Sequence, residues 1–185
     1  MFREKGFSLV ELLITLGLAT ILLSVAVPSF QTISMNSKQA GTVNELVAGM
    51  HLARNTAITL NARVAICASS NGQSCEVVGW NEGWIAFHDV DNDQVRDADE
   101  TILDTGTEVD GITIDSSQFP TAFTFRPNGR VMNGSTAINT GEFALCDRRG
   151  SEHAKVVILD ISGRPRLSEY KADGSRPRCG QAQAI

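Results

Sequence analysis

The sequence lacks the short motifs that mark common classes of enzyme. It has no G-x-S-x-G nucleophile elbow, no H-E-x-x-H zinc motif and no glycine-rich phosphate loop. Histidine is scarce, and His51, His88 and His153 stand far apart in the chain, so each is expected to be a surface or packing residue rather than a base. Internal repeats and low-complexity stretches are also absent. We therefore predict no active site and no enzymatic activity.

The chain also lacks the net positive charge of a general nucleic-acid binder, because its formal net charge is −5. The charge is unevenly distributed. Residues 89–115 contain ten acidic side chains and a single basic one, Arg96, whereas residues 164–178 contain five basic side chains against Glu169 and Asp173. A chain that is acidic overall can still present one basic end to a polyanion.

Cysteine is limited to Cys67, Cys75, Cys146 and Cys179, with no C-x-x-C pair and no histidine at zinc-finger spacing. An even number of scattered cysteines favours two disulfides formed in an oxidising compartment, with buried free thiols as the alternative. Three pairings are open. We favour Cys67–Cys75, which closes a short loop containing Asn-Gly, and Cys146–Cys179, which ties the C-terminal tail to the core.

One long apolar run is present near the N-terminus. Residues 7–27 contain a single charge, Glu11, and as a helix they would be about 31 Å long, enough to cross a bilayer. Arg3 and Lys5 precede the run, so the positive-inside rule places the segment after Pro28 outside the cytoplasm. Two alternatives stay open: a secretory signal, which would be shorter and end in a small-residue cleavage site, and a plain signal anchor, which would not explain the carboxylate.

The segment Gly6-Phe7-Ser8-Leu9-Val10-Glu11 resembles the class III leader of type IV pilins and type II secretion pseudopilins. The resemblance implies that a prepilin peptidase cuts between Gly6 and Phe7 and methylates the new N-terminus at Phe7. Glu11 would form a salt bridge with the N-terminal amine of a neighbouring subunit, since a buried amine and a buried carboxylate compensate each other. Pro28 matches the family's proline, which bends or locally melts the helix.

Beyond Pro28 the sequence predicts a second helical segment. Apolar residues recur at three- and four-residue steps and form a stripe expected to pack on the protein's own head: Val43, Leu46, Val47, Met50, Ala53, Ala57 and Leu60. We therefore divide the chain into a leader (1–6), a transmembrane and assembly helix (7–30), an amphipathic helix (31–61) and a head (62–185).

From residue 62 the apolar period changes to two, which predicts short strands joined by tight turns at Pro127-Asn128-Gly129 and Ser162-Gly163. The expected strands are 63–68, 83–88, 101–104, 111–115, 121–126, 142–147 and 155–160. The predicted fold is α+β, with a long helix packed on an antiparallel β-rich head. The order of GWIAFHDVDND, TFRPNGRV and SGRPR resembles the GspH/FimT/FimU group of pilin-like proteins.

The acidic run that starts at Asp89 fits part of a calcium-loop template. Positions 1, 3, 5, 7, 9 and 12 are Asp89, Asp91, Asp93, Val95 (through its carbonyl), Asp97 and Glu100. Two features argue against the template: Gln94 replaces the glycine of the sharp turn, and strands rather than helices flank the loop. A bound Ca²⁺ is one interpretation, and a solvated turn is the other.

The tail contains Gly163-Arg164-Pro165-Arg166, which resembles the G-R-x-R motif that binds DNA in FimT-type minor pilins. Arginine suits this role because its planar guanidinium grips phosphate with two hydrogen bonds. Four further arginines could widen the patch: Arg148, Arg149, Arg176 and Arg178. The alternative is a polar strand whose arginines pair with nearby carboxylates.

Together these patterns predict a minor pilin of a type IV pilus that primes assembly or sits near the fibre tip, with DNA binding as an added role. The alternative is the H-type pseudopilin of a type II secretion system. The expected partners are other minor pilins, the major pilin, the prepilin peptidase, the inner-membrane assembly platform and double-stranded DNA. The chain is expected to cross the inner membrane once with a periplasmic head before assembly, and to belong to the pilus afterwards.

Overall fold

The computed structural model describes residues 8–134 and 139–180. The chain forms two compact units, Met1–Lys38 and Gln39–Ile185. A single helix, α1 (Leu9–Thr59), contributes to both units and is long and apolar enough in its first part to span a membrane. Of the two effects expected at Pro28, a bend or local melting, the melting is not observed, because the residues around Pro28 are helical. The proposed division near residue 30 stays a prediction.

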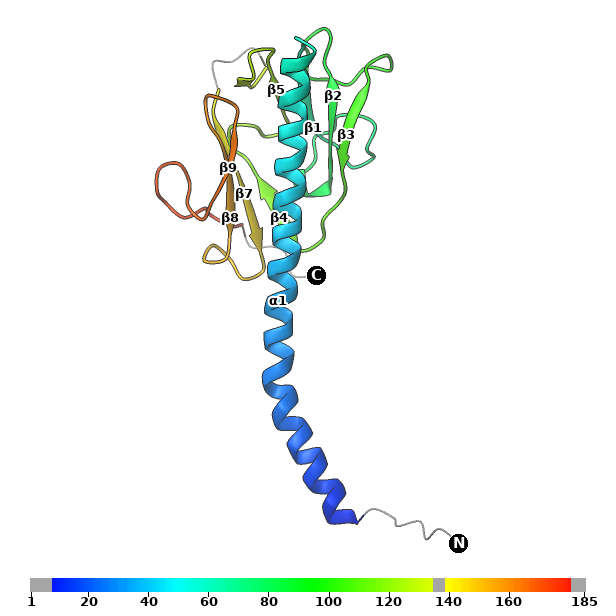
Figure 1. The fold of residues 1–185 in the computed structure, drawn as a ribbon, viewed down its shortest axis with the longest axis vertical. Coiled ribbons are helices and arrows are strands. Elements are labelled where there is room, and N and C mark those ends of the chain that lie inside the picture. The colour runs from blue at the N-terminus through cyan, green and yellow to red at the C-terminus, as the bar shows by residue number, and fades with distance from the viewer. Residues whose placement is uncertain (1–7, 135–138, 181–185) are drawn as a thin grey trace. The chain divides into compact units, whose positions relative to one another are not determined.

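The head contains two antiparallel sheets (Figure 1). The first has the order β3-β2-β1-β5-β6 and is built from β1 (Val64–Ala68), β2 (Trp84–His88), β3 (Ile102–Gly106), β5 (Ala122–Phe125) and β6 (Val131–Met132). The second has the order β4-β7-β8-β9 and is built from β4 (Ile112–Asp115), β7 (Gly141–Asp147), β8 (Lys155–Leu159) and β9 (Pro165–Ser168). A short 3-10 helix, η1 (Trp80–Glu82), precedes β2.

All seven strands expected from the period-two pattern are present, which confirms the predicted α+β class. Two strands of the described chain and η1 were not predicted. Strand β6 has only two residues, and β9 (Pro-Arg-Leu-Ser) begins with proline and alternates poorly. Strand β9 lies at the edge of its sheet, where a proline is tolerated because the missing N–H costs no ladder bond.

The main core is formed where both sheets meet the second half of α1. Helix residues Val43, Leu46, Met50, Ala53 and Ala57 are buried, as the predicted stripe required. They pack in one cluster with apolar side chains of both sheets: Val64, Ile66, Phe123 and Phe125 from the first, and Ile114, Phe143, Leu145, Val157 and Leu159 from the second.

The stripe was extended one residue too far, because Leu60 is exposed. The helix ends at Thr59, and Asn61 adopts the left-handed conformation with φ 49°. The Ala62 N–H donates to the Ala57 carbonyl and the Asn61 N–H to the Ile58 carbonyl, which is a Schellman-type ending. The chain therefore leaves the helix direction at this point, and Leu60 does not lie on the buried face of α1.

The second half of α1 approaches the first sheet closely at Gly49. A Cβ atom at Gly49 would overlap the indole ring of Trp84, and a Cβ at Gly106 of β3 would overlap the same ring from another direction. The indole therefore fills the space between a helix and a strand that two glycines leave open. Close packing of this kind fixes the helix against the sheet.

Candidate functional site

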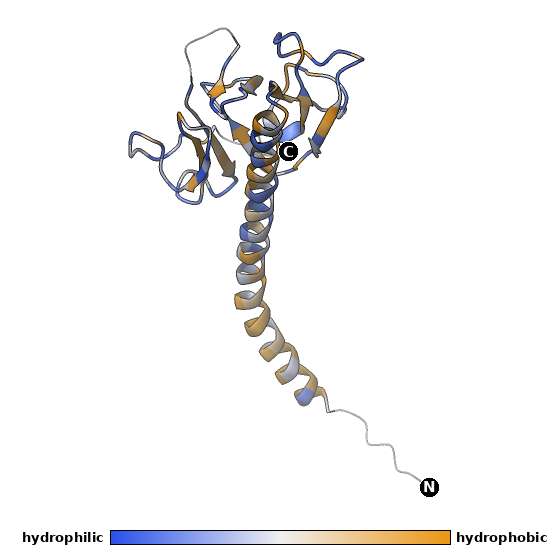
Figure 2. Ribbon diagram, turned by 45° about the horizontal axis from the view of Figure 1, so that its top comes forward, coloured by the Kyte–Doolittle hydropathy of each residue, from blue (hydrophilic) through white to orange (hydrophobic). Residues whose placement is uncertain are grey.

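The first candidate site is the exposed part of α1. From Leu9 to Ile33 the large apolar side chains are solvent-exposed, and Figure 2 shows this part of the helix as predominantly apolar. Glu11 lies within this stretch, is exposed and forms no ion pair within the described chain. Gly6 and Phe7, the predicted cleavage and methylation residues, lie outside the described residues.

Both favoured disulfides are present, and each holds a segment over the outer face of one sheet. Cys67 pairs with Cys75, and the loop between them helps to cover a small outer cluster formed by Ala65, Ile85 and Phe87. Cys146 on β7 pairs with Cys179 in the tail. These covers explain why β1 and β7 are buried along their whole length.

The tail is further attached to the second sheet through Glu142 of β7. Its carboxylate accepts a hydrogen bond from the Ala172 N–H at 3.0 Å and pairs with the Lys171 ammonium at 2.8 Å. The hydrogen bond that the Lys171 ammonium donates to Glu142, together with the negative charge of Glu142, raises the pKa of Lys171. The tail therefore forms part of the folded head as far as Cys179.

The Gly163–Arg166 motif lies at the turn into β9 and packs against the turn between β5 and β6. Gly163 has φ 71°, and a Cβ there would overlap the carbonyl oxygen of Gly129, so only glycine allows this close approach. Arg54 of α1 joins the two turns by donating from Nε to the carbonyls of Gly129 (3.1 Å) and Ser162 (3.3 Å).

Asp160 shapes the turn that presents Arg164. Its Oδ1 accepts hydrogen bonds from the Ser162 hydroxyl (2.6 Å), the Ser162 N–H (2.8 Å) and the Arg164 N–H (3.3 Å). The Ser162 hydroxyl is the main cause of a lowered pKa at Asp160, and the positive charge of Arg164 adds to it. The Arg164 side chain itself is exposed at the start of β9.

The six arginines proposed for DNA binding fall into two groups. The register pairs Arg166 with Ile158 and Ile158 with Glu142, whereas Arg148 lies six residues beyond Glu142, which is about 20 Å along the strand direction. Arg164 and Arg166 therefore lie at one end of the second sheet. The other four arginines lie at the opposite end, where the Cys146–Cys179 bridge brings the two chain segments together.

The side chains of two of those four arginines already have partners within the head. Arg149 forms an ion pair with Asp147, and although burial acts to raise the pKa of Asp147, the hydrogen bonds and charge of Arg149 outweigh it and lower that pKa. Arg176 lies 5.3 Å from the centre of the Tyr170 ring and donates to the Glu152 carbonyl at 3.1 Å. Arg148 and Arg178 are exposed.

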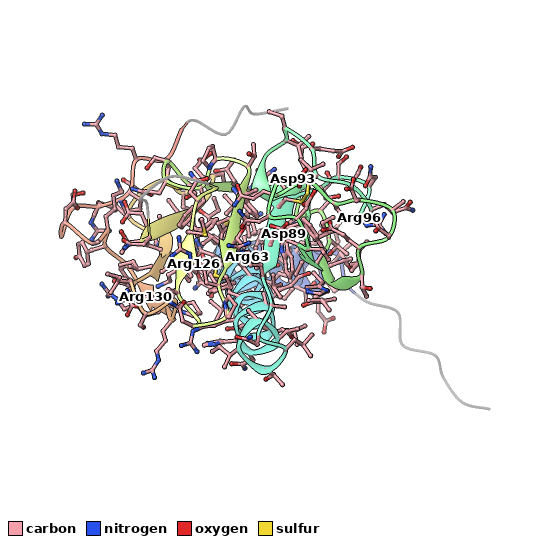
Figure 3. All side chains as sticks on the ribbon, turned by 90° about the horizontal axis from the view of Figure 1, so that it is seen from above. Arg63, Asp89, Asp93, Arg96, Arg126 and Arg130 are labelled. Atoms are coloured by element: carbon pink, nitrogen blue, oxygen red, sulfur yellow. A yellow bond between two sulfur atoms is a disulfide. The ribbon has the colours of Figure 1, made fainter. Side chains whose placement is uncertain are left out.

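The structure adds two arginines that sequence reasoning missed. Arg126 and Arg130 flank the β5–β6 turn, are exposed and have no ion pair within the described residues. Figure 3 shows both on the end of the head, in the same region as Arg63. The sequence signal for these two residues was the tight turn in Arg-Pro-Asn-Gly-Arg, which an arginine flanks on each side. The contact of this turn with Gly163 depends on tertiary packing, which the sequence pattern does not report. We call the two adjacent turns that carry Arg126, Arg130 and Arg164 the arginine turns.

Arg166 has a more acidic setting than the arginine turns. It lines a hollow of about 430 Å³ together with three carboxylates, those of Glu142, Asp160 and Asp173, and with the ammonium group of Lys171, which pairs with Glu142. A polyanion approaching Arg166 would therefore also meet carboxylates, which reduces the attraction.

The acidic loop brings together half of the predicted calcium ligands. Carboxylate oxygens of Asp89, Asp91 and Asp93 lie within 4.8 Å of one another, whereas Asp97 and Glu100 do not belong to this group. Glu100 is buried and closes the loop, because its carboxylate accepts the N–H groups of Val90 (2.7 Å) and Asp97 (3.1 Å). The Val95 N–H donates to Asp93 at 2.7 Å.

Gln94 adopts the turn conformation that was expected to require glycine. Its φ is 66°, and its side-chain amide donates to the hydroxyl of buried Thr124 at 2.9 Å. The missing glycine is therefore no obstacle to a tight loop here. Burial and the neighbouring carboxylates of Glu100, Asp93 and Asp91 raise the pKa of Asp89, although the N–H of Asn92 opposes this effect.

Comparisons with known proteins agree with the observed fold. Residues 42–163 match the family model of the type II transport protein GspH, and residues 1–27 match the prokaryotic N-terminal methylation motif. The curated proteins include no significant match to the chain. The fold is similar to that of the type IV minor pilin FimU of Pseudomonas aeruginosa, with 18% identity, a TM-score of 0.57 and coverage of 78% of this chain and 96% of that one. The minor pseudopilin EpsH of the type 2 secretion system of Vibrio cholerae is also similar, with 10% identity, a TM-score of 0.48 and coverage of 71% and 96%.

Proposed function

Because the chain belongs to the GspH family and carries the N-terminal methylation motif, it is a minor pilin or pseudopilin, and we propose that it serves a type IV pilus. In this proposal the subunit is anchored in the inner membrane by α1, with the head in the periplasm. After cleavage between Gly6 and Phe7 and methylation of Phe7, it enters the fibre with other minor pilins and primes assembly near the tip.

The observation that carries this proposal is the exposed apolar stretch of α1. A helix that is apolar on all sides needs lipid or other apolar helices around it. Within the described residues, no part of the chain covers the side chains from Leu9 to Ile33. Both environments suit a subunit that leaves the membrane and packs its helix among those of its neighbours.

Glu11 supports the fibre over a plain anchor. A carboxylate within an apolar span is costly in lipid. This cost favours moving the helix out of the lipid to a place where the carboxylate can pair with a cation. The N-terminal amine of the next subunit would supply that cation once both groups are buried in the fibre. The exposed arginine turns favour the pilus over the secretion system, because a pilus presents such a surface to its surroundings.

The test compares wild-type cells with cells carrying Glu11→Ala or Gly6→Val, and it scores surface pili and secreted proteins separately. We expect Glu11→Ala to give mature protein in the membrane but to lose incorporation into sheared pili. Gly6→Val should leave the precursor uncut. Loss of secreted proteins with normal pili would establish the H-type pseudopilin instead, and normal assembly of Glu11→Ala would contradict the salt-bridge role.

A second function, DNA binding, is favoured by the packing of the β8–β9 turn on the β5–β6 turn. This packing places the exposed arginines Arg126, Arg130 and Arg164 on adjacent turns. Guanidinium groups that bind DNA phosphates release the counterions condensed on the DNA, so binding at such a site would weaken as the salt concentration rises. The remaining candidates, Arg148 and Arg178, lie at the other end of the sheet.

The DNA test titrates full-length protein in detergent with double-stranded DNA at two salt concentrations. Arg164→Gln/Arg166→Gln and Arg126→Gln/Arg130→Gln should each weaken binding and reduce its salt dependence. Arg148→Gln/Arg178→Gln is the matched control because it removes the same charge at the opposite end. Equal weakening by all three variants would indicate non-specific attraction, and no binding at low salt would leave a purely structural subunit.

A further inference from the structure

The buried carboxylate of Asp89 has one oxygen without a hydrogen-bond partner. Asp89 is 1% exposed, and its Oδ2 is the one buried side-chain oxygen or nitrogen of the described residues that has no partner. Its Oδ1 accepts the N–H of Asn92 at 2.7 Å, so the hydrogen bond holds the carboxylate in place and leaves Oδ2 unsatisfied. Native proteins rarely leave such an atom buried without a partner, and an ion that has yet to bind is one reason for it.

Two further carboxylates lie beside the carboxylate of Asp89. Asp91 and Asp93 are exposed, and one oxygen of each lies within 4.8 Å of the others and of Asp89. Figure 3 shows Asp89 and Asp93 near each other in the end view of the head. Three carboxylates at this spacing repel one another unless a cation lies between them.

The spacing of the three carboxylates is compatible with calcium. Two oxygens bound to one Ca²⁺ are separated by at most about 5 Å, twice the usual calcium–oxygen distance, whereas Mg²⁺ limits them to about 4 Å. All three oxygens lie within 4.8 Å of one another, so one calcium ion can reach them without movement of the loop. Two exposed ligands also leave room for the water molecules that complete a coordination shell of six to eight oxygens.

The loop is anchored in a way that would hold these ligands. Glu100 fixes both ends of the loop through the N–H groups of Val90 and Asp97. Arg96 donates from Nε (3.3 Å) and Nη2 (3.1 Å) to the Glu100 carbonyl, so the guanidinium is directed to the base of the loop. We propose that Asp89, Asp91 and Asp93 bind one calcium ion at the end of the head.

The site is independent of the proposed pilus function and of DNA binding. Bound calcium fixes the acidic loop on β5, to which Gln94 already connects it through Thr124. Bound calcium also neutralises most of the negative charge of the three carboxylates. These carboxylates lie on the same end of the head as Arg63, Arg126 and Arg130 (Figure 3).

The test uses full-length protein in detergent, freed of divalent ions, with calcium chloride as the titrant in calorimetry and thermal unfolding. We expect saturable binding with a dissociation constant of about 10⁻⁴ to 10⁻³ M, in the range of extracellular calcium modules. About 10 mM calcium should then raise the unfolding midpoint by about 5 °C, because the ligand binds only the folded state.

Three variants make the test specific. Asp91→Asn/Asp93→Asn should weaken calcium binding at least about tenfold, since it removes two of three charged ligands. Asp99→Asn removes a charge from the same loop outside the cluster and should leave binding unchanged. Asp89→Asn should no longer respond to calcium, and its calcium-free midpoint should be at least that of the wild type, because a neutral amide costs less to bury than an unpaired carboxylate.

Several results would overturn the proposal. These are the absence of saturable heat together with an unmoved midpoint, an equal midpoint shift in Asp91→Asn/Asp93→Asn, or an equal shift of the wild type by the same concentration of Mg²⁺. A calcium-free midpoint of Asp89→Asn below that of the wild type would show that the carboxylate already has a stabilising partner, and it would overturn the proposal as well.

Discussion

Residues 9–33 and the described part of residues 39–185 both contain many large apolar side chains, but only the second region buries most of them. In the head, the second half of α1 lies on the inner faces of both sheets, and two disulfide-linked segments lie on their outer faces. The first half of α1 has no such cover within the described chain: Leu22, for example, is 69% exposed, whereas Leu46 of the same helix is 1% exposed.

The difference follows from the sequence patterns. Around Leu46 the apolar residues recur on one side of the helix, which suits packing against a single surface. Around Leu22 they occupy all sides, which suits a surrounding of lipid or neighbouring helices. One continuous helix therefore serves two environments, and a substitution should affect stability in one half and membrane insertion or assembly in the other.

The largest effect is expected when a charge is placed in each half in turn. Leu46→Asp puts an unpaired carboxylate into the core and should reduce the free energy of unfolding by at least about 4 kcal/mol, a large share of the stability of an ordinary domain. Thermal unfolding of the full-length protein in detergent, followed by tryptophan fluorescence, measures this change.

Leu22→Asp is the matched control for the first half of α1. The unfolding midpoint of its head should equal that of the wild type, while less of the protein should be recovered in the membrane fraction, because an aspartate within a spanning helix opposes insertion. A lowered midpoint for Leu22→Asp would show that this half also supports the head and would break the comparison.

A smaller effect is expected from removing the covers of the outer faces. Replacing Cys146 and Cys179 by serine opens a loop with a sequence separation of 33 and should cost about 3.7 kcal/mol in the chain-entropy treatment, whereas the Cys67–Cys75 loop, with a separation of 8, should cost about 2.5 kcal/mol. Urea unfolding of each double serine variant measures the two costs. If both variants were as stable as the wild type, hydrogen bonds such as that of Ala172 to Glu142 would be sufficient to hold the segments.

Much of the fold was predictable because its signals are local. The apolar run of α1, the helical stripe and the seven alternating strands each depend on the periodicity of a short segment. Strand β9 was not predicted because it gains its order from pairing with β8 rather than from its own composition, as the pairs Arg166–Ile158 and Leu167–Val157 show. Leu60 was misplaced because a Schellman ending at Asn61 is a conformational event that periodicity does not report.

The candidate sites were only partly predictable, since they depend on contacts between distant segments. The motif containing Arg164 was visible, but its neighbour turn with Arg126 and Arg130 is brought close only by the contact of Gly163 with Gly129. Likewise, the acidic loop was visible in sequence. The unsatisfied Oδ2 of Asp89 results from its burial at the end of β2, which no spacing reveals.

The smallest expected effect locates the boundary between the two regions. Gln39 is the first residue of the second compact unit, is buried, and donates from Nε2 to the Leu145 carbonyl of β7 at 3.3 Å. Gln39→Ala should reduce the free energy of unfolding by about 1 kcal/mol, the usual net value of one hydrogen bond. Gln31→Ala is the matched control: Gln31 is exposed on the same helix, so its replacement should leave urea unfolding unchanged. Equal losses from both variants would move the start of the supported helix toward the N-terminus, and no loss from Gln39→Ala would move it toward Val43, where the apolar contacts begin.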